Sequence, residues 1–132
     1  MSQDNVETAR QVLEAVNRRD LEAFGARFAA DAEIVPIRSA VDGTVYRGPD
    51  AAAKMFAAQE ESWDDLSVEN EEIRHGGDWV LVLGRIRGRG RTSGADFDVS
   101  AASVLYFREG LITKLHVYTN RTEALQAVGL SG

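Results

Sequence analysis

The chain has 132 residues, of which 44% are hydrophobic and 27% charged, a composition that predicts a folded domain rather than disorder. Its formal net charge of -6 argues against a nucleic-acid partner, because an acidic protein gains nothing from displacing the counterions of phosphates. There is no cysteine, which excludes disulfides and thiolate chemistry, and no apolar run is long enough to span a membrane. With no signal-peptide pattern at the N-terminus, we expect one domain over residues 1–132 in the cytoplasm.

The first half of the chain is predicted to be mainly helical. Apolar residues recur at spacings of three and four over residues 4–19, which indicates an amphipathic helix. Asp20 can cap a second, short helix, and residues 32–37 are expected to form a strand that ends near a proline. The segment Gly48-Pro49-Asp50 is typical of a helix start, so a third helix is predicted over residues 50–62.

The second half is predicted to be a meander of strands, because the hydrophobic period changes to two. Strands are expected over residues 66–74, 79–89, 95–108 and 111–118, followed by a helical turn or two over 121–128. Glycine pairs with polar residues between the strands favour tight hairpin turns. Helices first and a long antiparallel meander last predict an α+β fold, with the helices packed on the concave side of a strongly curved sheet.

Four segments follow one another in an order that resembles the nuclear transport factor 2-like superfamily. They are Val16-Asn17-Arg18-Arg19-Asp20-Leu21, Phe28-Ala29-Ala30-Asp31-Ala32, Tyr46-Arg47-Gly48-Pro49-Asp50 and Phe107-Arg108-Glu109-Gly110-Leu111-Ile112. The chain is most similar to the SnoaL-like branch, small proteins related to polyketide cyclases, ketosteroid isomerase and limonene epoxide hydrolase. This resemblance implies a cone-shaped barrel with a pocket, but not one activity, because the superfamily includes enzymes, transport factors and binders.

The resemblance to ketosteroid isomerase implies catalytic groups that this chain lacks. The carboxylate base of that enzyme falls on Pro36, and its two oxyanion donors fall on Val12 and Ser103. A supporting tyrosine falls on Phe56. Because a proline cannot abstract a proton, steroid-type isomerisation is disfavoured.

The other two enzyme resemblances are also incomplete. Limonene epoxide hydrolase implies an Asp-Arg-Asp set, of which Arg85 is present while the aspartates fall on Arg87 and Val117. The cyclase carboxylate falls near Asn120, whose amide can orient a substrate but cannot exchange a proton at neutral pH. Arg85, Ser103 and Asn120 remain as weak catalytic candidates for an enzyme with a non-standard set of residues.

Strand alternation places a candidate pocket. If Ser103 faces the cavity, Phe97, Val99 and Ala101 do too, and the same matching puts Leu81, Leu83, Arg85 and Arg87 of the preceding strand inward. The predicted ligand-binding residues are Val12, Val16, Phe56, Trp63, Leu83, Arg85, Ala101, Ser103, Leu115 and Val117. Such a lining suits a small hydrophobic ligand with a carbonyl or carboxylate.

Arg85 has an alternative role as an ordinary strand residue, facing solvent or paired with an acid. Gly84, Gly88 and Gly90 leave this open, because a bulge at any of them would reverse the faces.

Lys114, His116 and Tyr118 share the parity of the opposite, convex face. In the resembling superfamily that face often pairs two subunits, so a homodimer is expected through it. No His, Asp and Glu spacing is typical of a metal site, and no phosphate loop or dinucleotide fingerprint is present, so we expect neither metal nor cofactor. The competing functions are a ligand-binding domain, an enzyme of the isomerase, cyclase or hydrolase kind, and a protein-interaction module.

Overall fold

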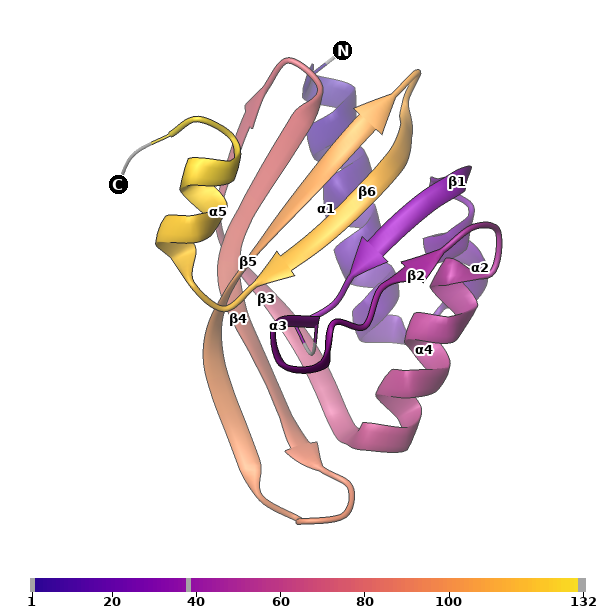
Figure 1. Cartoon of the computed structure of the whole chain (residues 1–132), viewed down its shortest axis with the longest axis vertical. Coiled ribbons are helices and arrows are strands. Elements are labelled where there is room, and N and C mark those ends of the chain that lie inside the picture. Colours follow the sequence, from indigo (N-terminus) through magenta and orange to yellow (C-terminus); the bar gives the residue numbers. More distant parts are fainter. Residues whose placement is uncertain (1, 38, 131–132) are drawn as a thin grey trace.

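The computed structural model describes residues 2–37 and 39–130 and combines helices with one curved sheet (Figure 1). The helices are α1 (Ser2–Arg18), α2 (Leu21–Gly25), α3 (Ser39–Asp42), α4 (Ala51–Ser62) and α5 (Arg121–Ala127). The strands are β1 (Phe28–Val35), β2 (Tyr46–Arg47), β3 (Trp63–Gly76), β4 (Trp79–Gly90), β5 (Asp96–Arg108) and β6 (Leu111–Tyr118). The last four strands, β3 to β6, therefore follow the first four helices, in the order that the sequence predicts.

The six strands form one sheet in the order β2-β1-β6-β5-β4-β3. β1 and β6 run parallel, and the other neighbouring pairs are antiparallel. β2 and β3 form the two edges, so the sheet curves without closing. The predicted α+β fold with a curved, mostly antiparallel sheet is confirmed, and the cone is open rather than a closed barrel.

Each face of the sheet carries its own hydrophobic core. The first core lies on the concave face, where α1, α2 and α4 pack, and it includes Val12, Phe24 and Leu115. The second core lies on the opposite, convex face, where α5 packs over Leu81 and Leu83. In Figure 1, α1 lies behind the sheet and α5 in front of it, which shows the two layers.

Two side chains near the end of α1 join the helices to each other and to the sheet. Asp20 accepts a hydrogen bond from the Ala23 N–H at 3.0 Å, which confirms the predicted cap of α2. The Asn17 carboxamide accepts from the Val68 N–H at 2.7 Å and donates to the Val68 carbonyl at 2.9 Å. Because Val68 belongs to the edge strand β3, Asn17 takes the place of a missing strand neighbour.

The segment between Val35 and Ala51 differs most from the prediction. β1 begins at Phe28, earlier than expected, and the sequence predicts neither α3 nor β2. These two elements are four and two residues long, too short to display a hydrophobic period. β2 exists through its pairing with β1, where Tyr46 lies opposite Ile34.

Candidate functional site

A cavity of about 550 Å³ opens on the concave side of the sheet. It is bounded by α4, by the segment that joins β1 to β2, and by parts of β3, β4, β5 and β6. The described residues that line it are Pro36, Ile37, Val41, Tyr46, Met55, Ala58, Gln59, Ser62, Trp63, Leu66, Ile86, Phe97, Val99, Val117 and Thr119. Most of these side chains are apolar, and the volume is in the range of small-molecule sites.

α4 covers the cavity with one side of its last two turns. The side chains involved are spaced three and four residues apart: Met55, Ala58, Gln59 and Ser62. The sequence assigns Phe56 to the ligand site, but its ring lies 5.0 Å from that of Phe24 and packs against the first core. The cavity-facing side of α4 is therefore rotated by about one residue from the predicted one.

Two aromatic rings form one wall of the cavity. Trp63 is the first residue of β3, directly after α4, and its ring centroid lies 4.8 Å from that of Phe97, with the planes inclined by 59°. Phe97 lies opposite Gly88 in the ladder between β4 and β5. A Cβ on Gly88 would come within 3.0 Å of the Phe97 ring, so glycine leaves the space that this ring occupies.

The predicted site residues on α1, β5 and β6 lie on the concave side of the sheet, as predicted. Val117 of β6 lines the cavity, and so does Trp63 of β3. Ala101 and Ser103 are buried on the concave side, because their strand partners are Gly84 and Val82. Val12, Val16 and Leu115 fill the first core on that same side. Contact of any of these residues with a ligand stays a prediction.

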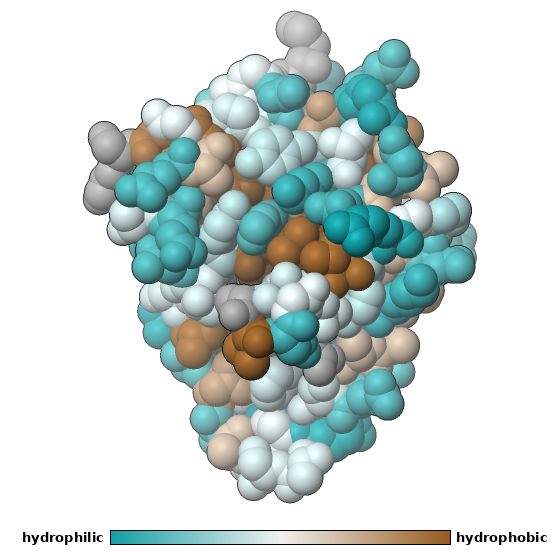
Figure 2. All heavy atoms as spheres, in the orientation of Figure 1, coloured by the Kyte–Doolittle hydropathy of each residue, from teal (hydrophilic) through white to brown (hydrophobic). Residues whose placement is uncertain are grey.

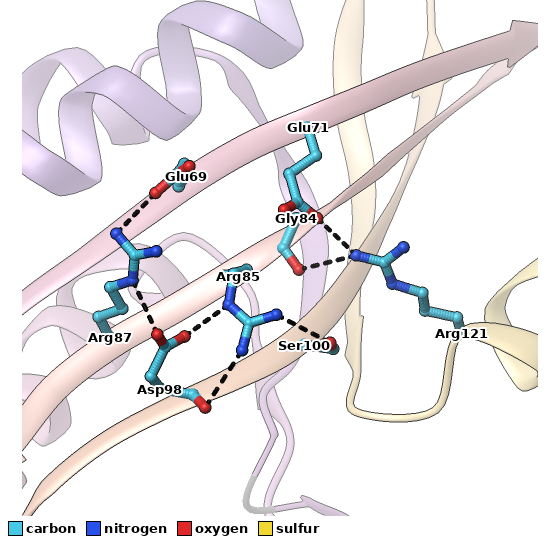
Figure 3. Close-up of polar contacts among 8 residues, drawn as sticks. All are labelled: Glu69, Glu71, Gly84, Arg85, Arg87, Asp98, Ser100 and Arg121. Carbon is cyan, nitrogen blue, oxygen red and sulfur yellow. Dashed lines mark hydrogen bonds and ion pairs between the residues drawn. The ribbon is translucent and has the colours of Figure 1, made fainter.

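The prediction that Arg85 anchors a ligand in the cavity is wrong. Arg85 lies opposite Ser100, and residues opposite each other in a ladder share a face, so its side chain is on the convex side. There its Nε donates to Asp98 at 2.6 Å, as Figure 3 shows. This hydrogen bond and the charge of Asp98 raise the pKa of Arg85. The hydrogen bond from Arg85, followed by the one from Arg87 and the charges of both arginines, lowers the pKa of Asp98. The alternative, an arginine paired with an acid, is the correct one.

Leu83 is also wrongly assigned to the cavity. It lies opposite Ala102 and is 4% exposed in the second core, where Leu125 of α5 packs. The error has a physical cause: residues 80–83 are all buried, because β4 is covered on both faces. A continuous apolar run has no alternation from which a face can be deduced, so the register with β5 decides.

The glycines that left the faces open do not interrupt the ladder between β4 and β5, whose register runs unbroken from Trp79 to Arg89. The irregularities lie instead in β3, one of them between Asn70 and Glu72. Gly84 faces this bulge so closely that a Cβ there would lie 1.9 Å from the Glu69 carbonyl oxygen. Gly84 is therefore required for the close approach of the two backbones.

Asn120 has a structural role rather than a position in the cavity. Its side chain caps α5 by accepting from the Glu123 N–H at 3.1 Å. The next residue, Arg121, donates to Glu71 at 2.7 Å and to the Gly84 carbonyl at 3.4 Å, which ties the start of α5 to the bulge of β3 (Figure 3). Thr119, directly before the cap, is the residue of this segment that lines the cavity.

The chemistry of the described lining is that of a binding site. It contains no Asp, Glu, His, Lys or Arg side chain. Its polar groups come from Tyr46, Gln59, Ser62, Trp63 and Thr119. These hydroxyl, amide and indole groups donate or accept hydrogen bonds but do not exchange protons readily near neutral pH.

Pro36, the residue on which the resemblance places a catalytic base, does line the cavity. Its side chain carries no proton to exchange.

Sequence reasoning missed several lining residues, and three of them represent different causes. Ile86 was missed because the wrong face of β4 was assigned to the cavity, and Met55 was missed because the cavity-facing side of α4 is rotated from the predicted one. Tyr46 belongs to the two-residue strand β2, for which no sequence signal exists. A strand register and a helix orientation are both tertiary facts, and each shifts a list of lining residues by one position.

The convex face of β6 carries the residues predicted for a subunit contact. Lys114, His116 and Tyr118 alternate with the inward-facing Leu115 and Val117. The rings of His116 and Tyr118 are stacked, with centroids 4.0 Å apart and an interplanar angle of 6°. Burial, followed by the charge of Lys114, lowers the pKa of His116. The face is as predicted, and the pairing of two chains through it stays a prediction.

The described residues form neither a metal site nor a membrane-spanning helix. Among residues 2–37 and 39–130, no three His, Asp or Glu side chains gather so that they could hold a metal ion. None of the described helices combines the length and the apolar character that a membrane crossing requires.

A family model described as the SnoaL-like domain matches residues 9–115. Searches of solved structures find the same fold. An NTF2-like protein of unknown function from Burkholderia pseudomallei K96243 is 22% identical with a TM-score of 0.80, over 98% of this chain and 99% of that one. An NTF2-like protein from Burkholderia xenovorans LB400 is 26% identical with a TM-score of 0.77, over 96% of each chain.

A third similar structure is a hypothetical protein with a ketosteroid isomerase-like fold from Catenulispora acidiphila DSM 44928, solved in complex with trimethylamine. It is 22% identical, with a TM-score of 0.77 over 94% of this chain and 93% of that one. No curated protein matches the sequence. These three structures agree on a fold and name no reaction, whereas another similar structure, from Xanthomonas campestris pv. campestris, is described as a putative polyketide cyclase (20% identical, TM-score 0.79, over 97% of this chain and 98% of that one).

Proposed function

The chain belongs to the SnoaL-like domain family, and from that premise we propose that its concave-side cavity binds a small hydrophobic ligand. One observation carries the proposal: a cavity of about 550 Å³ whose described lining is mostly apolar. Sites of this size bury most of a small ligand, and a few polar groups among apolar walls set its orientation. Binding rather than acid–base catalysis is favoured, because the described lining offers no group that exchanges protons near neutral pH.

The position of Arg85 on the convex face narrows the class of ligand that we propose. The sequence suggests a carbonyl or a carboxylate as the polar end, with Arg85 as the partner of the carboxylate. Because Arg85 lies on the convex face and pairs with Asp98, a carboxylate has no opposite charge in the described lining, whereas a neutral carbonyl needs only a hydrogen-bond donor such as Gln59 or Thr119.

Native mass spectrometry of the purified protein, followed by solvent extraction, tests the proposal. We expect a co-purifying small molecule that an Ala58→Trp variant loses, because Ala58 lines the cavity and an indole there would fill it. Ala53→Trp is the matched control, since Ala53 is exposed on the same helix. If the purified protein carries no small molecule and binds no aromatic probe, the proposed function is wrong.

We also propose that two chains associate through the convex face. Its support is the half-buried stack of His116 on Tyr118, together with hydrophobic side chains that gather near the middle of this face beside β1 and β6 (Figure 2). Sedimentation velocity should give a dimer at micromolar concentration, and His116→Glu should shift it to a monomer. Arg89→Ala, on the charged end of β4, is the control. A monomeric wild-type chain contradicts the dimer but not ligand binding.

The single domain over residues 1–132 and the cytoplasmic location are kept as proposals from the sequence.

A further inference from the structure

The strands that form the cavity turn their charged side chains away from it. On β4 and β5, Ile86 and Val99 line the cavity, whereas Arg85, Arg87 and Asp98 lie on the convex side. Figure 3 shows these three charged side chains pointing toward one another. These charges are also paired, because Asp98 accepts from Arg85 at 2.6 Å and from Arg87 at 3.1 Å, and Arg87 forms a second ion pair with Glu69 at 2.8 Å. A ligand in the cavity therefore meets no opposite charge on either strand, and the charges behind the sheet largely neutralise each other.

The polar groups inside the described lining are uncharged, and Gln59 is the most versatile of them. It lies on the side of α4 that covers the cavity and is half-buried. Its carboxamide has no hydrogen-bond partner among the described residues, and none of its polar atoms is sealed off from solvent. An amide both donates and accepts, so it can bind a carbonyl or a hydroxyl of a ligand.

We infer that the cavity selects uncharged ligands and that Gln59 binds their polar end. This inference rests on the proposed function and deepens it by naming the class of ligand. An ionised carboxylate or ammonium group loses its hydration on entry and finds no opposite charge in the described lining, which opposes binding strongly. A neutral carbonyl or hydroxyl loses less hydration and regains a hydrogen bond from the amide.

Three probes with the same ring system test the selectivity at pH 7. They are 2-naphthol, which is neutral, 2-naphthoate, which is an anion, and 2-naphthylmethylamine, which is a cation. Isothermal titration calorimetry on the full chain should show that 2-naphthol binds at least about a hundredfold more tightly than either ion, the scale of an uncompensated charge in an apolar site. Equal binding of 2-naphthoate and 2-naphthol overturns the charge selectivity and leaves the proposed function standing.

Variants of Gln59 test its role, with folding checked by circular dichroism. Gln59→Met should weaken 2-naphthol about tenfold without improving either ion, because one hydrogen bond is lost. Gln59→Glu places a negative charge in the lining and should reverse the order, so that the amine binds more tightly than 2-naphthol.

Glu60→Gln is the control for Gln59→Glu, because Glu60 is exposed and lies outside the cavity lining, and it should leave the order of the probes unchanged. If folded Gln59→Glu keeps the wild-type order, Gln59 does not bind the polar end. If none of the three probes binds the folded wild-type chain, the proposed function itself fails, and this inference with it.

Discussion

Leu83→Ala and Ile86→Ala form a matched pair, because the two residues lie on opposite faces of β4. Leu83 is 4% exposed and packs in the second core, so its truncation removes three buried carbons worth about 0.8 kcal/mol each. The cavity that is left adds to this loss, and the seven-residue helix α5 can settle into part of it. We expect the free energy of unfolding to fall by about 3 kcal/mol and the Tm by about 10 °C.

Leu83→Ala should have the larger effect on stability, and Ile86→Ala the larger effect on binding. Ile86 lines the open cavity and is only half-buried, so Ile86→Ala should lower the free energy of unfolding by only about 1 kcal/mol. It should nevertheless weaken 2-naphthol about tenfold, whereas Leu83→Ala should leave that affinity unchanged. Urea unfolding followed by circular dichroism measures the first quantity, and calorimetric titration below the transition measures the second. A weaker probe affinity in Leu83→Ala than in Ile86→Ala would refute the assignment of faces.

Three other changes have defined outcomes. Asn17→Ala should lower the free energy of unfolding by about 1–2 kcal/mol in urea, because both hydrogen bonds to Val68 are lost. Gly84→Ala should cost about 3 kcal/mol or more, because its Cβ would lie 1.9 Å from the Glu69 carbonyl oxygen. His116, whose pKa is lowered from 6.5, binds protons more weakly when folded, so stability should fall as the pH drops below about 6.5, and less so in His116→Gln.

Each of these has a control on a similar residue. Asn70→Ala removes an exposed amide from β3, the strand that Asn17 binds, and should change the unfolding free energy by less than about 0.5 kcal/mol. Gly25→Ala places a Cβ at an ordinary 3.7 Å from Ala52 and should be tolerated. His75→Gln controls for the loss of a histidine. A Gly84→Ala protein as stable as wild type, or a His116→Gln profile parallel to wild type from pH 7 to pH 5, would contradict the structural reasoning.

Local patterns determined much of the fold. The three-and-four spacing of Val6, Ala9 and Leu13 predicted α1, and these residues are buried in the first core. Asp20 predicted the cap that it makes. The assumption that Ser103 faces the concave side came from the resemblance, and it put Leu115 and Val117 on that side too; all three lie there.

Local patterns failed where neighbouring elements decide. The buried run at residues 80–83 has no alternation, so its faces follow from the register with β5, which turned Arg85 outward to Asp98. The short strand β2 depends on its partner β1 and contributes Tyr46 to the cavity without any local signal.

The sequence by itself therefore determined the order of the elements, the curved sheet under helices and the apolar character of a pocket, because these depend on periodicity and composition. Only the tertiary structure decided which side chains line that pocket and that Arg85 is not among them. The physical reason is that successive side chains of a strand point to opposite faces of the sheet. A shift of one position in the register exchanges a charged residue for an apolar one, which here puts Ile86 instead of Arg85 in the described lining of the cavity.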